Sequence, residues 1–440
     1  MKSWITPFPV ALPAQQDNLH LFDTATQQKQ RVTVTDDHAT MYVCGITPYD
    51  ATHLGHANTY VAFDLLYRYW LAAGHRVTYT QNVTDVDDPL FERANEMGID
   101  YRELSEDQTN LFRSDMQHLN VLSPSHYLSV SETVDWVRNM VREMLDAGVA
   151  YTVPGDDNNP DGDIYFSIAA AEEHTDWRLG AVGAHSQEEM IEFFPERGGD
   201  PQRAGKRNPL DPLVWSARRD GEPYWHDDVL GDGRPGWHVE CSAIAYHTLP
   251  APFTVQGGGS DLRFPHHEFS AAHTTAVTHQ PMAEYFVHSG MVGLDGVKMS
   301  KSLGNLELVS NLVSRVESPM AIRALLLSNH YRSDWSYSHE KLGEAAKRFQ
   351  TWRSALGCEQ IGDAETVLKD IFAALSDDLD APRALDAVDR WAQESIARGI
   401  PRASNLPSIT VAVVLDALLG IKLGGDTAEA QEELAGRIIA

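Results

Sequence analysis

The stretch HATMYVCGITPYDATHLGHANTYVAFDLLYRYWLAAG, residues 38–74, decides the fold of this 440-residue chain. Residues 38–46 form an apolar run typical of a β-strand, whereas residues 53–74 show helical spacing and end at Gly74, a residue type that commonly closes a helix. The segment RVTYTQNV, residues 76–83, has the pattern of a second strand. The three segments together predict a strand–helix–strand unit.

Strand and helix patterns continue to alternate to about residue 300. They include a helix over 132–148 and strands over 253–258 and 283–290. Such alternation favours an α/β fold, a Rossmann-like domain over residues 1–305 with a parallel sheet and helices on both faces. Residues 154–236 interrupt it, because they are rich in Gly, Pro, Asp and Trp; they predict a loop-rich insertion at one end of the sheet.

After residue 305 we expect the strands to stop. Five segments there show helical spacing, and we therefore predict an all-α helical bundle over residues 306–440. The segments are 319–331, 340–357, 364–380, 382–398 and 408–421.

Composition excludes several classes of protein. The chain is 42% hydrophobic and 22% charged, and no window offers the roughly 20 apolar residues that a membrane helix needs. The N-terminus lacks the features of an export signal, so we expect a cytoplasmic protein with no membrane partner, and a monomer. Three cysteines cannot form a disulfide framework. The net charge of −28 disfavours nucleic acid as a partner, although acidity also serves solubility.

Two short motifs carry candidate chemistry. His53-Leu54-Gly55-His56 opens the first helix directly after a strand and loop, where free N–H groups and the helix dipole attract phosphate. DGVKMSKSLGN, residues 295–305, places Lys298 and Lys301 in a Gly- and Ser-rich loop suited to binding a departing pyrophosphate. Either motif alone is compatible with packing or surface residues.

Together, in this order, the two motifs resemble the paired signatures of class I aminoacyl-tRNA synthetases and their ligase relatives. The resemblance implies a Rossmann-type catalytic domain in which ATP, with Mg²⁺, and a carboxylate form an acyl adenylate. It also implies catalytic roles for His53 and His56, which would hold the triphosphate, and for Lys298 and Lys301, which would counter the charge of the pyrophosphate.

Three further segments resemble the cysteinyl branch of class I: MYVCGITPYD, DGRPGWHVECSA and GGGSDLRFPHH. The resemblance implies one Zn²⁺ per chain, bound by Cys44, Cys241 and His266, with His267 as the rival for the last place. Two thiolates and an imidazole leave an open position, the pattern of a catalytic zinc.

The sequence also departs from the cysteinyl-tRNA synthetases, which usually continue HHENE with a further carboxylate ligand. This chain has Ser270 in place of that acid. Either three protein ligands suffice, or Glu268 substitutes from a different angle. Cys358 is expected to be a packing residue.

The same resemblance implies a pocket for cysteinyl-AMP. Its cysteinyl part would be lined by residues from four segments and its adenosine part by two more. The residues are Cys44, Gly45, Ile46, Thr47, Thr59, Asn82, Val83, Thr84 and Trp237, and for the adenosine Gly259, Ser260, Asp261 and Val292.

Features outside these motifs bear on the acceptor. The chain ends about 20 residues after the last predicted helix, so we expect no anticodon-binding domain. DVDDPLFERA, with Pro89 where the synthetases commonly have lysine, and PERGGDP (195–201) resemble the cysteine ligases of mycothiol biosynthesis. That resemblance implies ligation of L-cysteine, through cysteinyl-AMP, to the amine of glucosaminyl-inositol. Glu196, Arg197 and Asp200 are then candidate acceptor-binding residues, unless they only form an ordered turn.

Two alternatives stay open. One is a truncated cysteinyl-tRNA synthetase, which differs only in its acceptor. The other is a non-catalytic cysteine- or nucleotide-binding relative, which has no physical need of both lysines and both histidines.

Overall fold

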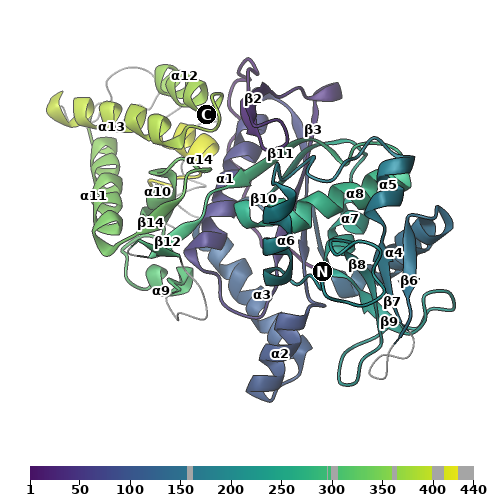
Figure 1. The fold of residues 1–440 in the computed structure, drawn as a ribbon. Coiled ribbons are helices and arrows are strands. Elements are labelled where there is room, and N and C mark those ends of the chain that lie inside the picture. The colour runs from purple at the N-terminus through teal and green to yellow at the C-terminus, as the bar shows by residue number, and fades with distance from the viewer. Residues whose placement is uncertain (156–161, 295, 299–305, 359–363, 399–410, 425–440) are drawn as a thin grey trace.

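The computed structural model describes residues 1–155, 162–294, 296–298, 306–358, 364–398 and 411–424. At its centre five parallel strands form one sheet in the order β11-β10-β3-β4-β5 (Figure 1). The strands are β3 (His38–Ile46), β4 (Arg76–Val83), β5 (His126–Ser129), β10 (Phe253–Gly259) and β11 (Ala283–Ser289). The three that come first in the chain lie on one side and the last two on the other, which is the doubly wound Rossmann order. The predicted α/β fold is confirmed.

The opening stretch folds as its pattern predicts. β3 and β4 have the predicted bounds, and α1 (Leu54–Ala73) joins them. The helix ends because Gly74 adopts a left-handed conformation, with φ of 91°, and its N–H bonds back to the last turn.

Side chains of β3 alternate between two hydrophobic cores. Met41 and Val43 face the core that contains α1 and the C-terminal helices, whereas Tyr42 and Cys44 face the core that contains the insertion. We call these the nucleotide-side core and the metal-side core. This alternation places Cys44 on the opposite face of the sheet from α1.

The remaining elements of the first 300 residues cover the sheet or flank it. A hairpin precedes the sheet, and helices join its strands. They are β1 (His20–Asp23), β2 (Gln28–Arg31), α2 (Asp88–Met97), α3 (Tyr101–His118), α4 (Val130–Asp146), α7 (Trp237–Thr248) and α8 (Glu268–Thr278), with short helical turns over Thr35–Asp37, Ser260–Leu262 and Arg263–His267.

The insertion contains more regular structure than its composition predicts. It holds an antiparallel sheet in the order β6-β7-β8-β9 and two helices, and its first strand begins at Ala150, before the predicted start. The elements are β6 (Ala150–Val153), β7 (Asp163–Phe166), α5 (Ile168–His174), α6 (Gln187–Glu196), β8 (Leu213–Ala217) and β9 (Gly233–Pro235). The sheet's strands are three to five residues long, so Gly and Pro in the turns between them dominate the sequence signal.

Helices dominate the chain after residue 305, at the opposite side of the molecule from the insertion (Figure 1). They are α9 (Val309–Val313), α10 (Met320–Leu327), α11 (His339–Leu356), α12 (Ala364–Leu375), α13 (Ala381–Arg398) and α14 (Val411–Leu419). The expectation that strands stop at 305 is wrong at one place. β14 (Trp335–Tyr337) pairs in parallel with β12 (Val292–Leu294), which also pairs with β13 (Val297–Lys298).

The nucleotide-side core joins α1 to the C-terminal helices through a buried ionic junction. Asp64 of α1 accepts from Arg68 Nε at 2.7 Å and from Arg323 of α10, and all three side chains are buried. The Arg323 guanidinium also donates to the carbonyl oxygens of Leu419 and Leu119, at 2.6 and 2.8 Å. These contacts fix the helical region to the helix that begins with His53-Leu54-Gly55-His56.

Within the residues that the structure describes, no helix combines the length and apolar character needed to span a membrane.

Candidate active site

A cavity of about 360 Å³ opens where the strand order reverses, beyond the carboxyl ends of β3 and β10. Ligands of doubly wound sheets bind at this position. Most of the residues predicted for cysteinyl-AMP line it, together with both histidines of the helix start. The lining comprises Cys44, Gly45, Ile46, Thr47, Tyr49, His53, Gly55, His56, Thr59, Tyr60, Trp237, Gly259, Asp261, Leu262, Gly290, Met291, Val292 and Leu306.

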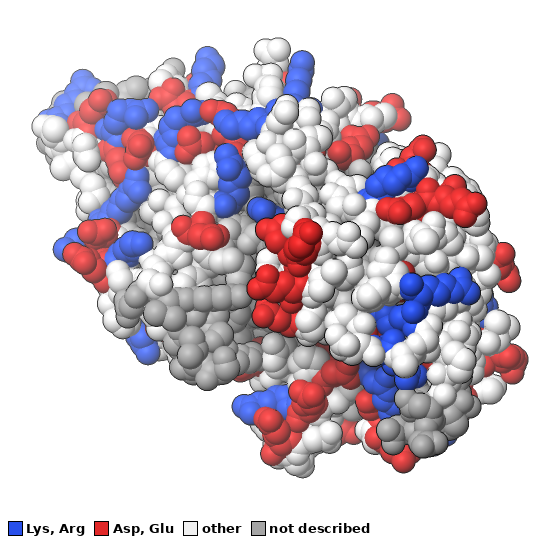
Figure 2. Space-filling model, viewed as in Figure 1, with Lys and Arg blue, Asp and Glu red and all other residues white. Residues whose placement is uncertain are grey.

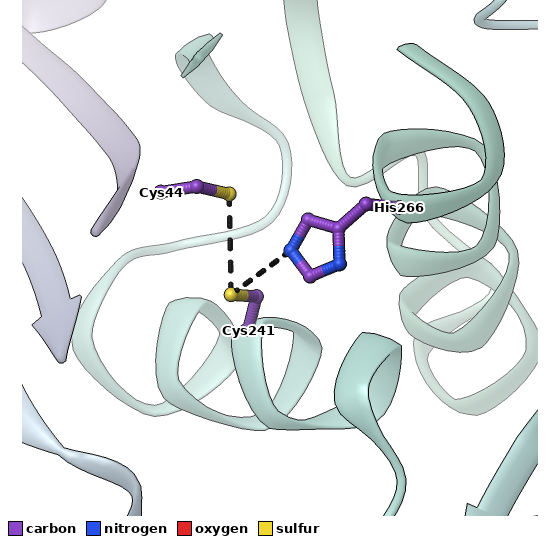
Figure 3. Close-up of side chains that lie close together, drawn as sticks. All are labelled: Cys44, Cys241 and His266. Atoms are coloured by element: carbon purple, nitrogen blue, oxygen red, sulfur yellow. Dashed lines mark hydrogen bonds between the residues drawn. The ribbon is translucent and has the colours of Figure 1, made fainter. Parts of the chain in front are cut away.

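The three predicted metal ligands meet beside this cavity, and Cys44 is the one that lines it. Cys44 lies two residues before the end of β3, Cys241 lies one turn into α7, and His266 precedes α8, so three distant segments converge (Figure 3). The Cys44 and Cys241 sulfurs are 3.9 Å apart, and His266 Nε2 lies 3.2 Å from Cys241 Sγ. All three ligand atoms lie within 4.8 Å of one another, and all three residues are buried.

Electrostatics separate the two thiols of the cluster. Burial raises the pKa of Cys44 well above its usual value. Burial acts in the same direction on Cys241, but hydrogen bonding with Cys44 and the charge of His266 bring the pKa of Cys241 well below its usual value. The cluster therefore favours a thiolate at Cys241, which is the form that binds metal ions.

His267, the rival ligand, is held by other partners. Its Nε2 lies 3.2 Å from Cys44 Sγ and 3.2 Å from Gln256 Nε2, and its Nδ1 lies 2.8 Å from His288 Nε2. It does not belong to the described group whose ligand atoms lie mutually within 4.8 Å.

The other residues considered as ligands point elsewhere. The Glu268 carboxylate accepts backbone N–H groups of the insertion at 2.9–3.0 Å, and Ser270 Oγ donates to the carbonyl of His238 at 3.2 Å. Cys358 lies just beyond α11, where its Sγ is 3.8 Å from the Ser354 carbonyl.

Trp237 forms the wall above the metal cluster. It is the first residue of α7, one helical turn before Cys241, so both side chains lie on the same face of the helix. Its ring stacks on that of His266, with centroids 4.6 Å apart and planes 27° from parallel. The stack fixes the orientation of the imidazole beside the cavity.

The two histidines at the start of α1 stack with ring centroids 3.8 Å apart. His53 Nδ1 accepts the N–H of Gly55 at 3.0 Å and so caps the helix. A Cβ at Gly55 would lie 2.8 Å from the His53 ring, which explains the glycine between them. Burial lowers the pKa of both imidazoles, that of His56 well below its usual value, so both are neutral at pH 7 and act as hydrogen-bond donors.

The lysine motif lies partly outside the described residues. Lys298 lies in β13, where its backbone pairs with Gly293 of β12. Gly293 directly follows Val292, which lines the cavity. Lys301 falls outside the described residues. The chain after the motif returns to the start of α1. Leu54 N–H donates to the Glu307 carbonyl at 3.0 Å, and Val309 N–H to the Thr52 carbonyl at 3.0 Å. The described residues on either side of 299–305 thus lie beside the cavity, and Leu306 lines it.

Four predicted pocket residues are absent from the described lining: Asn82, Val83, Thr84 and Ser260. Asn82 instead supports the lining, because its Oδ1 accepts the N–H of Gly45 at 2.8 Å. The backbones approach so closely that a Cβ at Gly45 would lie 1.6 Å from the Asn82 carbonyl oxygen.

Sequence reasoning missed several lining residues. Tyr49 and Tyr60 lie inside the opening stretch, and Gly290 and Met291 directly follow β11. The rule that ligands bind at the carboxyl ends of parallel strands could have identified the last two.

The predicted acceptor residues lie in the insertion, outside the cavity lining. Arg197 donates to the carbonyl oxygen of Asp261 at 2.9 Å and to that of Phe264. Asp200 accepts from Lys206 Nζ at 2.8 Å and from the Tyr165 hydroxyl, whereas Glu196 is exposed at the end of α6. These contacts hold the insertion together and against the segment that carries His266.

A larger hollow, about 580 Å³, lies between residues 173–182 of the insertion and α8. None of the predicted site residues that the structure describes lines it.

The chain is similar in sequence to one protein family and to several named ligases. The family described as tRNA synthetases class I (C) catalytic domain matches residues 30–347. The chain is 57% identical over 423 residues to a protein of Micrococcus luteus named L-cysteine:1D-myo-inositol 2-amino-2-deoxy-alpha-D-glucopyranoside ligase, covering 96% of this chain and 100% of that protein. A Paenarthrobacter aurescens protein of the same name is 50% identical over 427 residues, with the same coverage.

Among solved structures, the chain resembles a methionyl-tRNA synthetase of Mycobacterium tuberculosis in complex with methionyl-adenylate. The TM-score is 0.62 at 15% identity, over 90% of this chain and 96% of that one. At this identity the likeness concerns the fold alone.

Proposed function

We propose a function that starts from the family of this chain. The chain belongs to the class I (C) tRNA synthetase catalytic-domain family and, within it, to the L-cysteine:1D-myo-inositol 2-amino-2-deoxy-alpha-D-glucopyranoside ligases. The enzyme joins L-cysteine to the amine of glucosaminyl-inositol in two steps. The cysteine carboxylate first attacks the α-phosphate of ATP, which gives cysteinyl-AMP and pyrophosphate. The acceptor amine then attacks the cysteinyl carbonyl carbon, and the bond to AMP breaks as the amide forms, the step specific to mycothiol biosynthesis.

The nucleotide side of the cavity suits the first step. His53 and His56 lie at the N-terminus of α1, where neutral imidazole donors and the helix dipole act together on a triphosphate with its Mg²⁺. Lys298 and Lys301 would neutralise the pyrophosphate as it leaves. Gly259, Asp261 and Val292 of the lining, with Ser260 beside them, would contact the adenosine.

The metal side suits selection of cysteine. A tetrahedral zinc site with bonds of about 2.3 Å to sulfur separates two thiolates by about 3.8 Å. The 3.9 Å between Cys44 and Cys241 and the nearby His266 fit that geometry. Bound there, one Zn²⁺ would offer its open position to the substrate thiolate and discriminate against the hydroxyl of serine.

The acceptor is proposed to be a small amine. The net charge of −28 opposes a polyanion at long range. On the face shown in Figure 2, basic side chains are interspersed with acidic ones instead of forming a continuous basic surface. Glu196, Arg197 and Asp200 remain candidates for the acceptor side, although Arg197 and Asp200 already have partners within the protein. The proposal also includes a monomeric state and a cytoplasmic location. The location follows from the free cysteines, since free thiols need a reducing compartment.

A single observation carries the proposal: Cys44, a member of the Cys–Cys–His cluster, lines the same cavity as His53 and His56 at the helix start. The test supplies purified protein with ATP, labelled cysteine and either glucosaminyl-inositol or tRNA. We expect label in the amide and AMP as product. Transfer to tRNA at a higher rate would instead identify a truncated synthetase, and no transfer with no cysteine-dependent pyrophosphate exchange would identify a non-catalytic relative.

A further inference from the structure

The segment 261–268, which we call the ligand segment, contributes to both sides of the cavity. Asp261 and Leu262 line the cavity, and His266 completes the metal cluster. The segment is an irregular pair of short turns, interrupted at Phe264 by extended backbone with φ of −137° and ψ of 135°. A regular hydrogen-bond ladder therefore does not fix its position, and contacts from elsewhere have to do so.

The insertion makes the first such contact through Arg197. This residue directly follows α6, and its guanidinium donates to the carbonyl oxygens of Asp261, at 2.9 Å, and Phe264. The Phe193 ring lies beneath the guanidinium, 4.7 Å from centroid to Cζ. One side chain thus satisfies two carbonyl groups at the beginning of the ligand segment, and the stack on Phe193 limits its freedom to move.

A second contact holds the other end of the segment. The Glu268 carboxylate is fully buried and accepts the backbone N–H groups of Gly180, Val182 and Gly183 at 3.0, 3.0 and 2.9 Å. Gly180 has φ of +92°, so the turn that presents these donors depends on a glycine. Three charge-assisted bonds to one carboxylate make a rigid attachment.

Aromatic packing fills the space between the two contacts. Phe194 of α6 is buried against Phe264 and Phe269, with ring centroids 6.2 and 6.1 Å apart. The insertion therefore touches the ligand segment at its beginning, along its length and at its end.

We propose that Arg197 and Glu268 are positioning residues through which the insertion holds the ligand segment, so that His266 faces Cys241 and Asp261 faces the cavity. The insertion then serves the activation of cysteine as well as any recognition of the acceptor. This inference rests on the proposed function, because it assumes that the cluster holds a metal ion.

Residues that support a metal ligand without touching the metal typically change metal affinity or activity by 10- to 100-fold when they are replaced. Arg197→Ala would leave two carbonyl oxygens without their donor. Glu268→Gln would turn an amide NH₂ toward backbone N–H groups and so replace attraction by repulsion. Both changes act on the ligand segment and leave Cys44 and Cys241 untouched.

The experiment compares these two variants with matched controls from the same insertion. Arg207→Ala removes the same charge, but Arg207 is exposed and lies over the Tyr151 ring, away from the ligand segment. Glu172→Gln alters a carboxylate that accepts the N–H of Leu179 at 2.9 Å, within the insertion. Arg197→Lys keeps the charge and can restore one of the two carbonyl contacts.

Three quantities are measured on each full-length variant: zinc affinity by competition with a chromophoric chelator, cysteine-dependent pyrophosphate exchange, and amide formation. We expect Arg197→Ala and Glu268→Gln to lose about 10-fold or more in zinc affinity and to slow both reactions by the same factor. Arg197→Lys should recover part of the loss, and both controls should stay within about twofold of the parent.

Two results would overturn the inference. In one, both variants bind zinc as tightly as the parent, or lose no more affinity than their controls. In the other, only amide formation slows in Arg197→Ala, which would make Arg197 an acceptor-binding residue. A parent protein that binds no zinc would contradict the proposed function instead, and the exchange assay on the variants would still decide whether the insertion positions Asp261.

Discussion

The metal-side and nucleotide-side cores are built from the same central sheet, but their functional residues are brought together in different ways. On the nucleotide side, His53 and His56 lie on one helical turn, and the helix is fixed from behind by the C-terminal helices. On the metal side, Cys44, Cys241 and His266 come from three separate segments, of which the first and the last lie 222 residues apart in the sequence. The insertion packs around them.

This difference has a functional consequence. A motif at the start of a helix adopts its geometry once that helix has formed. A cluster of residues from distant segments, in contrast, depends on the position of every segment that contributes to it. We therefore expect substitutions on the metal side to abolish cysteine recognition with little effect on global stability, and substitutions in the nucleotide-side core to affect stability first.

The largest expected effect is that of Cys241→Ala. With one thiolate removed, the remaining two ligands cannot hold the ion. We expect the variant to contain less than about a tenth of the parent's zinc and to lose cysteine-dependent pyrophosphate exchange by about 1,000-fold or more. Both losses exceed the 10- to 100-fold effect that is typical of a residue that only supports a metal ligand. Metal analysis and exchange measure this directly. Cys358→Ala, outside the cluster, is the control. Unchanged zinc in Cys241→Ala would remove the metal-side core from the mechanism.

Next comes Arg323→Met, which tests the nucleotide-side core. Asp64 and Arg323 are both fully buried, and loss of one partner from a buried ion pair typically costs 3–5 kcal/mol of stability. Urea unfolding should show a loss of about that size, with zinc content unchanged. Arg348→Met, whose ion pair is partly exposed in the same helical region, should cost less than about 1 kcal/mol. Equal losses in the two variants would mean that the junction is not what joins the helices to α1.

A smaller effect is expected from His56→Ala. Removal of one preorganised donor from the phosphate site should slow pyrophosphate exchange by about 100-fold. Zinc content should not change, because His56 belongs to the other side of the cavity. His126→Ala, an exposed histidine on β5, serves as the control. Loss of zinc in His56→Ala would show that the two sides are not independent.

The smallest effect concerns Asp115 of α3, beside the nucleotide-side core. Burial raises the pKa of Asp115 to about 7, and the nearby Thr52 hydroxyl offsets only part of that rise. Because the pKa is raised on folding, the ionised form destabilises the protein, and stability from this group falls as the pH rises from about 4 to about 7. Asp115→Asn should remove that slope, so that the variant exceeds the parent in stability by more at pH 8 than at pH 5.5, as measured by urea unfolding at the two pH values. A variant that is less stable at both pH values would contradict the assignment.

The two cores also differ in how far the sequence predicts them. β3, α1 and β4 follow from local periodicity, and their observed bounds match the expected ones closely. The helix-start motif is readable for the same reason, since its residues are neighbours in the chain.

Spacing alone could not bring Cys44, Cys241 and His266 together; only resemblance to a family connected them. The contacts of Arg197 and Asp200 were also beyond the sequence, because a charged residue in a Gly- and Pro-rich segment looks the same whether it faces a ligand or a backbone carbonyl. β14 escaped prediction because Trp335–Tyr337 is too short to show a strand period and depends on pairing with a distant strand.

The most direct test of the division between the two sides is made on the parent protein. Zinc is removed with a chelator, ATP binding and cysteine-dependent pyrophosphate exchange are measured, and one equivalent of zinc is then returned. The expected result is that the metal-free protein still binds ATP but has lost exchange with cysteine, and that zinc restores it. Full exchange with cysteine in the metal-free protein would contradict the assignment of cysteine recognition to Cys44, Cys241 and His266.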